Sequence, residues 1–180
     1  MDDGGFVLVS DVLKLDQMHR YSEEEIVDVV RQNKKQRFAL RTNPSTGQLA
    51  IRANQGHSVD VQQLELRRIT STDECPLAIH GSSWQNWPSI AQSGLSRMNR
   101  QHIHMAAGLP GDSGVISGMR ARCTLLIYVD VQKALSAGLQ FFRSTNNVIL
   151  SPGNEEGRIP PEYFLRVIRR TKDNKEEVIR

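Results

Sequence analysis

Apolar and polar positions near the start of the chain predict helices. Residues 21–33, "YSEEEIVDVVRQN", bring several apolar side chains to one helical face. Ser22 and Glu25 before them have the S-x-x-E spacing of a capping box, and the acidic residues there favour the positive end of a helix. Upstream, "GGFVLVSDVLKL" predicts a short strand or turn that enters a helix capped at Ser10-Asp11.

The next segment predicts a β-hairpin. The runs "RFALR" and "LAIRA" alternate in polarity on either side of "TNPSTGQ", where Pro44 and Gly47 favour a turn. Helices followed by a basic hairpin are typical of a winged-helix-like lobe, a common nucleic-acid scaffold. We expect this lobe to occupy residues 1–70.

The pattern changes to short strands after the polar segment "RRITSTDECPLA". "LAIHGSS" and "HIHMA" predict strands, "CTLLIYVD" predicts a buried one, and "LQFFRSTNNVILSPG" predicts two around a turn at residues 144–147. "VQKALSAG" and "WQNWPSIAQSG" predict short helices, the second ended by Gly94. Many short strands with few helices indicate an α+β protein, with a mixed β lobe over residues 71–170 and a charged, frayed tail over residues 171–180.

Composition narrows the cellular setting. The 180 residues are 38% hydrophobic, enough for a core, and no run approaches the roughly 18 apolar residues of a membrane span. The N-terminus is acidic before it is apolar, the reverse of a secretory signal. Cys75 and Cys123 have no metal-ligand or C-x-x-C spacing, so we expect buried reduced thiols. We expect an intracellular monomer, cytoplasmic or nuclear, that does not bind membranes.

Charge is unevenly distributed, although the net charge is only +3. Residues 31–59 contain no Asp or Glu, and residues 94–111 repeat this pattern. Such windows favour a surface that meets phosphates, although a solvated basic face gives the same pattern. The cations of the first window are Arg31, Lys34, Lys35, Arg37, Arg41 and Arg52, and those of the second are Arg97 and Arg100, with His102 and His104.

The motifs of several site classes are missing. His102 and His104 would face one side of a strand, but no carboxylate or cysteine accompanies them at zinc-like spacing, and nearby arginines repel a cation. We therefore expect no metal. The sequence also contains no G-x-S-x-G, P-loop or G-x-G-x-x-G motif.

Two arginines remain as candidates for binding an anion. Arg52 in "RANQGHS" and Arg143 in "FFRSTNN" each lie on a turn beside small polar residues. A planar guanidinium suits bidentate contact with phosphate, and such neighbours leave backbone N–H groups available. The alternatives are that Arg143 pairs with Asp130 or Glu155, and that His57 caps the hairpin.

Several motifs together resemble one enzyme family. "RFALR…LAIRANQGHS", "IHGSSWQNWPSI…GL", "RQHIHMA", "LLIYVD" and "FFRSTNNVILSPGNEEGRIPPEYF" match the RNA 2′-phosphotransferase family in order and spacing, from Gly5 to about Val167. The resemblance implies an N-terminal winged-helix RNA lobe and a C-terminal ADP-ribosyltransferase-like lobe that binds NAD. The implied partners are 2′-phosphorylated tRNA or RNA and NAD, which is consumed.

The family's reaction has two steps. The 2′-phosphate left at a tRNA splice junction attacks C1″ of the nicotinamide ribose and expels nicotinamide. The ribose 2″-hydroxyl then attacks phosphorus, which gives a 2′-OH RNA and ADP-ribose 1″,2″-cyclic phosphate. The phosphate is itself the nucleophile, so the first step needs cations rather than a protein nucleophile.

The resemblance also implies roles for individual residues. Arg52 and Arg143 are the catalytic arginines, the first on the 2′-phosphate and the second on the later transition state. The RNA phosphate would be bound by Arg37, Arg52, Gly56, His57 and Ser58. NAD would be bound by His80, Gly81, Ser82, His104 and Val148, with an apolar residue at 148 where polymerising relatives carry glutamate; a core valine is the alternative there.

The chain departs from the family pattern at its start. The family carries an Arg-His pair upstream of a "D-G-[FY]-V" turn, and that turn is "DDGGFV" here, at residues 2–7. His19-Arg20 has reversed order and lies downstream, so it is not given that role. A chain without the pair is expected to be impaired in the second step. Two other functions remain open: an RNA- and NAD-binding module without turnover, and ADP-ribosylation of terminal phosphates on nucleic acid.

Overall fold

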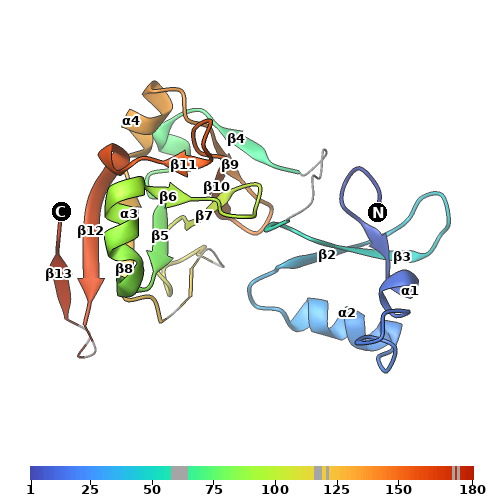
Figure 1. The fold of residues 1–180 in the computed structure, drawn as a ribbon. Helices are drawn as coiled ribbons and strands as arrows, with labels where there is room; N and C mark the ends of the chain where they lie inside the picture. Colours follow the sequence, from blue (N-terminus) through green and yellow to red (C-terminus); the bar gives the residue numbers. More distant parts are fainter. Residues whose placement is uncertain (58–64, 116–118, 121, 172, 174) are drawn as a thin grey trace. The chain divides into compact units, whose positions relative to one another are not determined.

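The computed structural model describes residues 1–57, 65–115, 119–120, 122–171, 173 and 175–180. The chain folds into two compact units, Met1–Glu65 and Leu66–Arg180 (Figure 1). Both mix helices and strands, and strands predominate in the second, as expected for an α+β protein. The division lies five residues before the boundary expected from the sequence.

The first unit is a small sheet with two helices. Strands β1 (Val7–Leu8), β2 (Phe38–Thr42) and β3 (Leu49–Ala53) form an antiparallel sheet in the order β1-β3-β2. Helices α1 (Val9–Val12) and α2 (Glu23–Gln32) lie on one side of the hairpin in Figure 1. The predicted hairpin is confirmed.

The helix starts were predicted with mixed success. The capping box of α2 is present, with Ser22 and Glu25 each bonded to the other's backbone. The predicted cap at Ser10-Asp11 is wrong, because α1 already begins at Val9 and the Asp11 carboxylate accepts a bond from Lys14. In α2 only Ile26 is buried, so the apolar face predicted for this helix is narrower than its sequence suggests.

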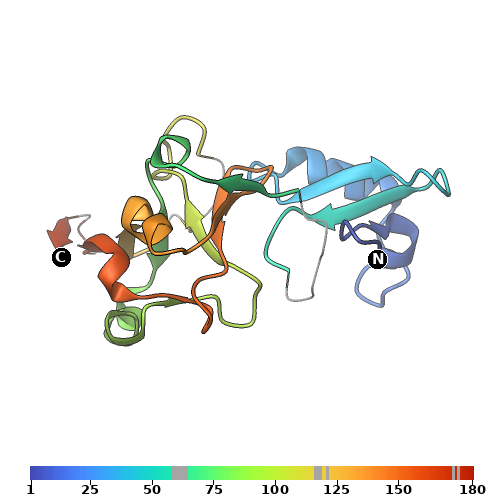
Figure 2. The same cartoon turned by 90° about the horizontal axis from the view of Figure 1, so that it is seen from above.

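The second unit is built on one large antiparallel sheet. Its eight strands run in the order β13-β12-β8-β5-β7-β10-β9-β4, and β6 pairs with β11 in a separate ladder. Short helices connect them, as the two views show (Figures 1 and 2). The elements are β4 (Arg67–Ile69), η1 (Thr72–Glu74), β5 (Ile79–Ser82), η2 (Trp84–Asn86), α3 (Trp87–Ser93), β6 (Leu95–Ser96), β7 (Ile103–Ala106), β8 (Leu125–Val129), α4 (Val131–Ser136), β9 (Phe141–Arg143), β10 (Val148–Ser151), β11 (Arg158–Ile159), η3 (Pro161–Tyr163), β12 (Phe164–Arg170) and β13 (Glu176–Val178).

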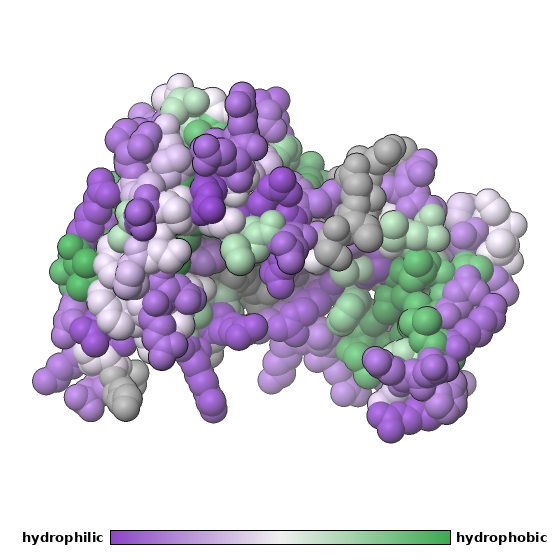
Figure 3. Space-filling view, in the orientation of Figure 1, coloured by the Kyte–Doolittle hydropathy of each residue, from purple (hydrophilic) through white to green (hydrophobic). Residues whose placement is uncertain are grey.

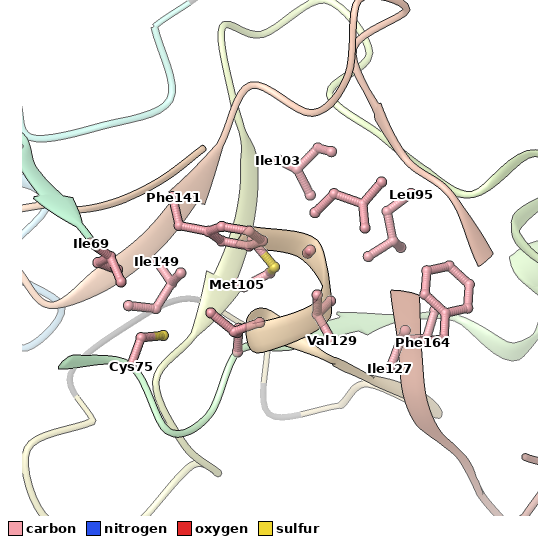
Figure 4. Packing of buried hydrophobic residues seen from close by; sticks show 14 of the residues in the cluster. Ile69, Cys75, Leu95, Ile103, Met105, Ile127, Val129, Phe141, Ile149 and Phe164 are labelled. Atoms are coloured by element: carbon pink, nitrogen blue, oxygen red, sulfur yellow. The ribbon is translucent and has the colours of Figure 1, made fainter. Parts of the chain in front are cut away.

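The central strands are apolar on both faces because both faces are covered. On β8, Leu125 and Ile127 enter the larger buried cluster, whereas Leu126 enters a smaller one with Ile79. Figure 4 shows part of the larger cluster, with Phe141 and Met105 near its centre. The predictions of a buried strand at 123–130, a helix after it and two strands around the 144–147 turn are confirmed.

Both edges of the sheet differ from the sequence expectation. The tail is not frayed throughout, since β13 pairs with β12 and its glutamates contact Arg169 and Arg170. At the other edge, β4 forms within the polar segment that was expected to separate the lobes and pairs with β9. Cross-strand pairing therefore orders segments whose own sequences are polar.

The surface drawn in Figure 3 is largely hydrophilic, and apolar residues gather over the first unit. Within the part of the chain that the structure describes, no helix has the length and apolar character needed to cross a membrane. Cys75 and Cys123 are buried and unbridged, as predicted.

Candidate functional site

Arg52 lies on β3 with its side chain only 4% exposed. Nη1 donates to the carbonyl of Gly4 at 3.2 Å, and Nη2 donates to the carboxylate of Glu65 at 2.7 Å. The guanidinium carbon lies 4.6 Å from the centroid of the Phe6 ring. Nε is buried without a hydrogen-bond partner among the described residues. A donor in this state favours an additional acceptor, because a buried unpaired N–H is costly.

The turn after β3 is held by main-chain contacts. Asn54 is buried; its backbone N–H donates to the carbonyl of Arg37, and its side-chain amide donates to the carbonyl of Gln36 at 2.7 Å. Gly56 has φ 82°, a left-handed conformation that favours glycine. His57 donates from Nε2 to the carbonyl of Ala53 at 2.9 Å, because a carbonyl can only accept.

Three residues of this region were predicted to bind the RNA phosphate. His57 contacts the end of the hairpin, in agreement with the alternative interpretation that it caps the hairpin. Arg37 is exposed at the start of β2 and lies beside the same turn through its carbonyl contact with Asn54. Ser58 lies outside the described residues.

A second arginine shares the ring beneath Arg52. The guanidinium carbon of Arg41 lies 4.0 Å from the centroid of Phe6, and Nη2 donates to the carboxylate of Asp2. Desolvation tends to raise the pKa of the Asp2 carboxyl. Bonds from the backbone N–H groups of Phe6 and Gly4, together with the charge of Arg41, outweigh this effect, so the pKa lies below its usual value. In the sequence alone, Arg41 stood out only as a basic residue. Hairpin register was the missing signal, since it puts Arg41 opposite Ala50, two residues from Arg52.

The second unit holds two partly buried histidines on neighbouring strands. His80 on β5 donates from Nδ1 to the carbonyl of His104 on β7 at 2.9 Å, which leaves Nε2 as an acceptor. Burial lowers the pKa of His80, opposed by that bond. Burial also lowers the pKa of His104 to about 4, with help from the charges of Arg100 and His102. Both rings are therefore neutral near pH 7.

His104 and Val148 lie on the same face of the sheet. Leu150 pairs with His104 and Val148 pairs with Ala106, and paired residues in an antiparallel ladder face the same side. Nε2 of His104 is buried with no hydrogen-bond partner in the described residues. Val148 is fully buried, so its alternative role as a core residue is also met.

Gly81 and Ser82 complete the predicted NAD motif on β5. A Cβ at Gly81 would lie 2.7 Å from Sγ of Cys123, so packing itself requires glycine here. Ser82 accepts a bond at Oγ from the side-chain amide of Asn86 at 3.0 Å. Alternation along β5 puts Gly81 on the His104 face and His80 with Ser82 on the other. The histidines meet through the carbonyl of His104 rather than ring to ring.

Arg143 ends β9 and is tied down at both terminal nitrogens. Nη1 donates to the side-chain oxygen of Asn147, and Nη2 donates to the backbone carbonyl of Glu74. The predicted alternative of a pair with Asp130 or Glu155 is not what holds it. The amide of Asn147 also donates to the carbonyl of Gly114 at 2.6 Å, which links the turn to the loop after β7.

The remaining His, Cys, Asp and Glu side chains add no further centre. Among the residues that the structure describes, no three of them gather where a metal ion could be held. Glu74 carries two bonds, from Arg67 at 2.9 Å and from Thr70, and these keep its pKa below the usual value. Its backbone carbonyl and its carboxylate thus serve Arg143 and Arg67 separately.

Comparison with known proteins identifies the family. Residues 1–153 match the family described as "RNA 2'-phosphotransferase, Tpt1 / KptA family". The chain belongs to this family. It is 51% identical to "tRNA 2'-phosphotransferase 1" of Danio rerio over 171 residues, which are 94% of this chain and 76% of that relative.

More distant members of the RNA 2′-phosphotransferase family align over a similar span. "tRNA 2'-phosphotransferase 1" of Homo sapiens is 48% identical over 93% of this chain and 67% of its own length. "tRNA 2'-phosphotransferase" of Saccharomyces cerevisiae is 34% identical over 93% of this chain and 74% of its own length. The chain thus spans about two thirds to three quarters of these three relatives.

Within this RNA 2′-phosphotransferase family chain, the candidate residues form two groups. Arg37, Arg52, Gly56 and His57 belong to the first unit, with Arg41 and Glu65 added by the structure. The second unit contains the other group, which consists of His80, Gly81, Ser82, His104, Arg143 and Val148, with Glu74 and Asn147 added as partners of Arg143.

Proposed function

We propose that this chain removes the 2′-phosphate left in tRNA by splicing and transfers it to the ADP-ribose part of NAD. The products are 2′-OH RNA, nicotinamide and ADP-ribose 1″,2″-cyclic phosphate. Family membership and relatives named for this activity support the reaction. The single observation that carries the proposal in this molecule is Arg52, a buried guanidinium on the family's "RANQGHS" segment whose Nε has no hydrogen-bond partner among the described residues.

The two units have separate tasks in this proposal. The first is a winged-helix-like lobe that binds RNA, supported by two helices followed by a basic hairpin. The second is an ADP-ribosyltransferase-like lobe that binds NAD, supported by the histidines on its neighbouring central strands. We assign RNA binding to the first unit and NAD binding to the second from family membership as well as from the helices and strands of each unit.

The first step joins the 2′-phosphate to NAD. A phosphate oxygen attacks C1″ of the nicotinamide ribose, the C1″–N bond breaks, and nicotinamide leaves with the bonding electrons. Arg52 binds the phosphate, and Arg37, Gly56, His57 and Ser58 shape its seat. The nucleophile comes from the RNA, which agrees with the state of Cys75, whose pKa is raised to about 11 chiefly by burial.

NAD is held by His80, Gly81, Ser82, His104 and Val148 in this scheme. Neutral imidazoles suit a dinucleotide because they hydrogen-bond to hydroxyl groups without adding a charge. Nε2 of His104, which is buried and has no partner in the part of the chain that the structure describes, gives the ligand a polar contact. The valine at 148 leaves the face beside His104 without a carboxylate, which would repel an incoming phosphate dianion.

The second step releases the RNA. The 2″-hydroxyl of the joined ribose attacks phosphorus and loses its proton, and the bond from phosphorus to the RNA 2′-oxygen breaks. That oxygen takes a proton and becomes the 2′-OH. Arg143 stabilises the negative charge that moves between these oxygens, and its bonds to Asn147 and Glu74 keep the guanidinium preorganised.

The test is nicotinamide release with two matched oligoribonucleotides that differ only in an internal 2′-phosphate. We expect nicotinamide release only with the 2′-phosphorylated strand, called the marked strand below, together with its conversion to 2′-OH RNA and formation of the cyclic phosphate. Equal NAD cleavage with both strands would refute the acceptor. Binding of both ligands without turnover would identify a binding module, and labelling of a terminal phosphate would identify ADP-ribosylation of nucleic-acid ends.

A further inference from the structure

Phe6 gathers two arginines on one face of the first unit's sheet. The guanidinium carbons of Arg41 and Arg52 lie 4.0 Å and 4.6 Å from the centroid of its ring. Register explains the convergence, because Arg41 pairs with Ala50 and side chains two apart on β3 share a face. Phe6 precedes β1, which pairs with β3 on the opposite side from β2.

The arrangement concentrates positive charge. A ring attracts each cation, but two cations at one ring repel each other. Each arginine therefore takes a carboxylate, Asp2 for Arg41 and Glu65 for Arg52. Carboxylates that balance charges in this way occupy positions where phosphate oxygens can form the same charge-assisted bonds.

The two arginines differ in access. Arg52 is 4% exposed, and the Arg41 side chain is 43% exposed. A buried guanidinium suits a phosphate monoester such as the 2′-phosphate, which is attached through one oxygen and can enter an enclosed site. An exposed guanidinium suits a backbone phosphate, which lies along the protein surface as a diester and is the same at every nucleotide.

We infer that Arg41 binds the RNA backbone phosphate next to the 2′-phosphorylated nucleotide. This inference rests on the proposed function, in which Arg52 binds the 2′-phosphate itself. Arg41 sets the position of the strand and Arg52 selects the modified nucleotide. The residue thus contributes equally to the affinity for marked and unmarked RNA.

The test uses Arg41→Gln, with Arg169→Gln as a matched control. Arg169 is 40% exposed, lies 4.7 Å from the ring of Trp84 and pairs with Glu177 at 3.4 Å, so it repeats the setting of Arg41 in the other unit. Fluorescence anisotropy gives the affinity for marked and unmarked oligoribonucleotides over a series of KCl concentrations.

We expect Arg41→Gln to weaken both RNAs by the same factor of about 3–10 and to reduce the slope of log K against log salt by about 0.7, the value for one contact to a single strand. Arg169→Gln should leave both quantities unchanged. An unchanged slope in Arg41→Gln, or a loss confined to the marked strand, would overturn the inference.

Two measurements keep the outcome clear. Arg41→Lys retains the charge and should retain the salt slope even if Arg41→Gln unfolds; a slope reduced in the lysine variant also overturns the inference. Failure of the proposed function shows differently, as equal affinity of the wild-type chain for both strands. In that case Arg41→Gln still tests the backbone contact.

Discussion

The buried guanidinium of Arg52 donates to the exposed carboxylate of Glu65 across 2.7 Å. The side chains are 4% and 71% exposed, so the carboxylate is the partner that can move away. A carboxylate at this place competes with a phosphate for the same donor. In the proposed reaction, Glu65 is therefore a counterion that the 2′-phosphate of the RNA would displace.

Glu65→Gln tests this competition. Removing the negative charge should lower KM for 2′-phosphorylated RNA by about 5-fold, as expected for an ion pair worth about 1 kcal/mol, with kcat unchanged. Steady-state kinetics with the marked oligoribonucleotide measures both. Glu177→Gln removes the carboxylate partner of the more exposed Arg169 in the second unit and should change neither parameter. A rise in KM would show that Glu65 orients Arg52 rather than competing for it.

Arg143→Lys separates charge from geometry at the second proposed catalytic residue. Lysine keeps the positive charge but cannot reach Asn147 and the Glu74 carbonyl together from a planar fork. We expect kcat to fall by about 10²-fold or more, with a much smaller change in KM for RNA. Single-turnover gels should show the joined RNA–ADP-ribose intermediate accumulating, because the second step is the slowed one.

Arg68→Lys is the control for that variant, since Arg68 is exposed on the neighbouring strand β4. It should keep wild-type kcat. Thermal melting of both variants separates a folding defect from a catalytic one. Loss of nicotinamide release together with the second step, in a folded Arg143→Lys protein, would move the role of Arg143 to the first step.

Local signals predicted much of the fold. The capping box of α2, the Pro-Gly turn of the hairpin and the apolar run of β8 each act within a few residues, so the sequence shows them directly. The edge strands β4 and β13 were not predicted. They are polar, and pairing with β9 and β12 orders them.

The candidate site was likewise predicted only in part. Motifs indicated Arg52, Arg143, His80 and His104 as candidates, but some of their partners, such as the carbonyls of Gly4 and Glu74, come from distant parts of the chain. The Glu74 carbonyl lies 69 residues before Arg143, and no sequence pattern marks a carbonyl as an acceptor. Contacts of this kind depend on how the strands are registered, which the sequence does not display.

Gly81→Ala should destabilise the second unit. The new methyl group would lie 2.7 Å from Sγ of Cys123 and 2.8 Å from Cβ of Met119, closer than packed atoms approach. Overpacking of this kind costs about 1–3 kcal/mol of unfolding free energy. Urea unfolding followed by tryptophan fluorescence measures it, because both tryptophans, Trp84 and Trp87, lie in this unit.

Cys123→Ala provides the matching rescue. In the Gly81→Ala background it removes the nearest atom and should recover part of the lost stability, whereas alone it should destabilise by leaving a small cavity. Strictly additive effects of the two substitutions would contradict the contact, since residues that touch are expected to couple.

Stability of the second unit should fall as the pH drops below about 6.5. Burial lowers the pKa of His104 from 6.5 to about 4, and it lowers that of His80 in the same direction. Between these values the unfolded chain binds a proton that the native chain does not, so the unfolding free energy decreases as the pH falls. His104 alone accounts for a loss of about 2 kcal/mol at about pH 5, and the loss levels off below about pH 4.

Urea unfolding at about pH 7 and about pH 5, again followed by tryptophan fluorescence, measures this dependence. His104→Asn removes one of the two titrating groups, so between the two pH values its stability should fall by about 2 kcal/mol less than that of the wild type, and His80 accounts for the remaining change. His19→Asn replaces an exposed histidine of the first unit and should retain the wild-type dependence. Equal pH dependence in wild type and His104→Asn would mean that His104 takes up its proton as readily in the folded chain as in the unfolded one, and the neutral ring proposed to hold NAD would have to be abandoned.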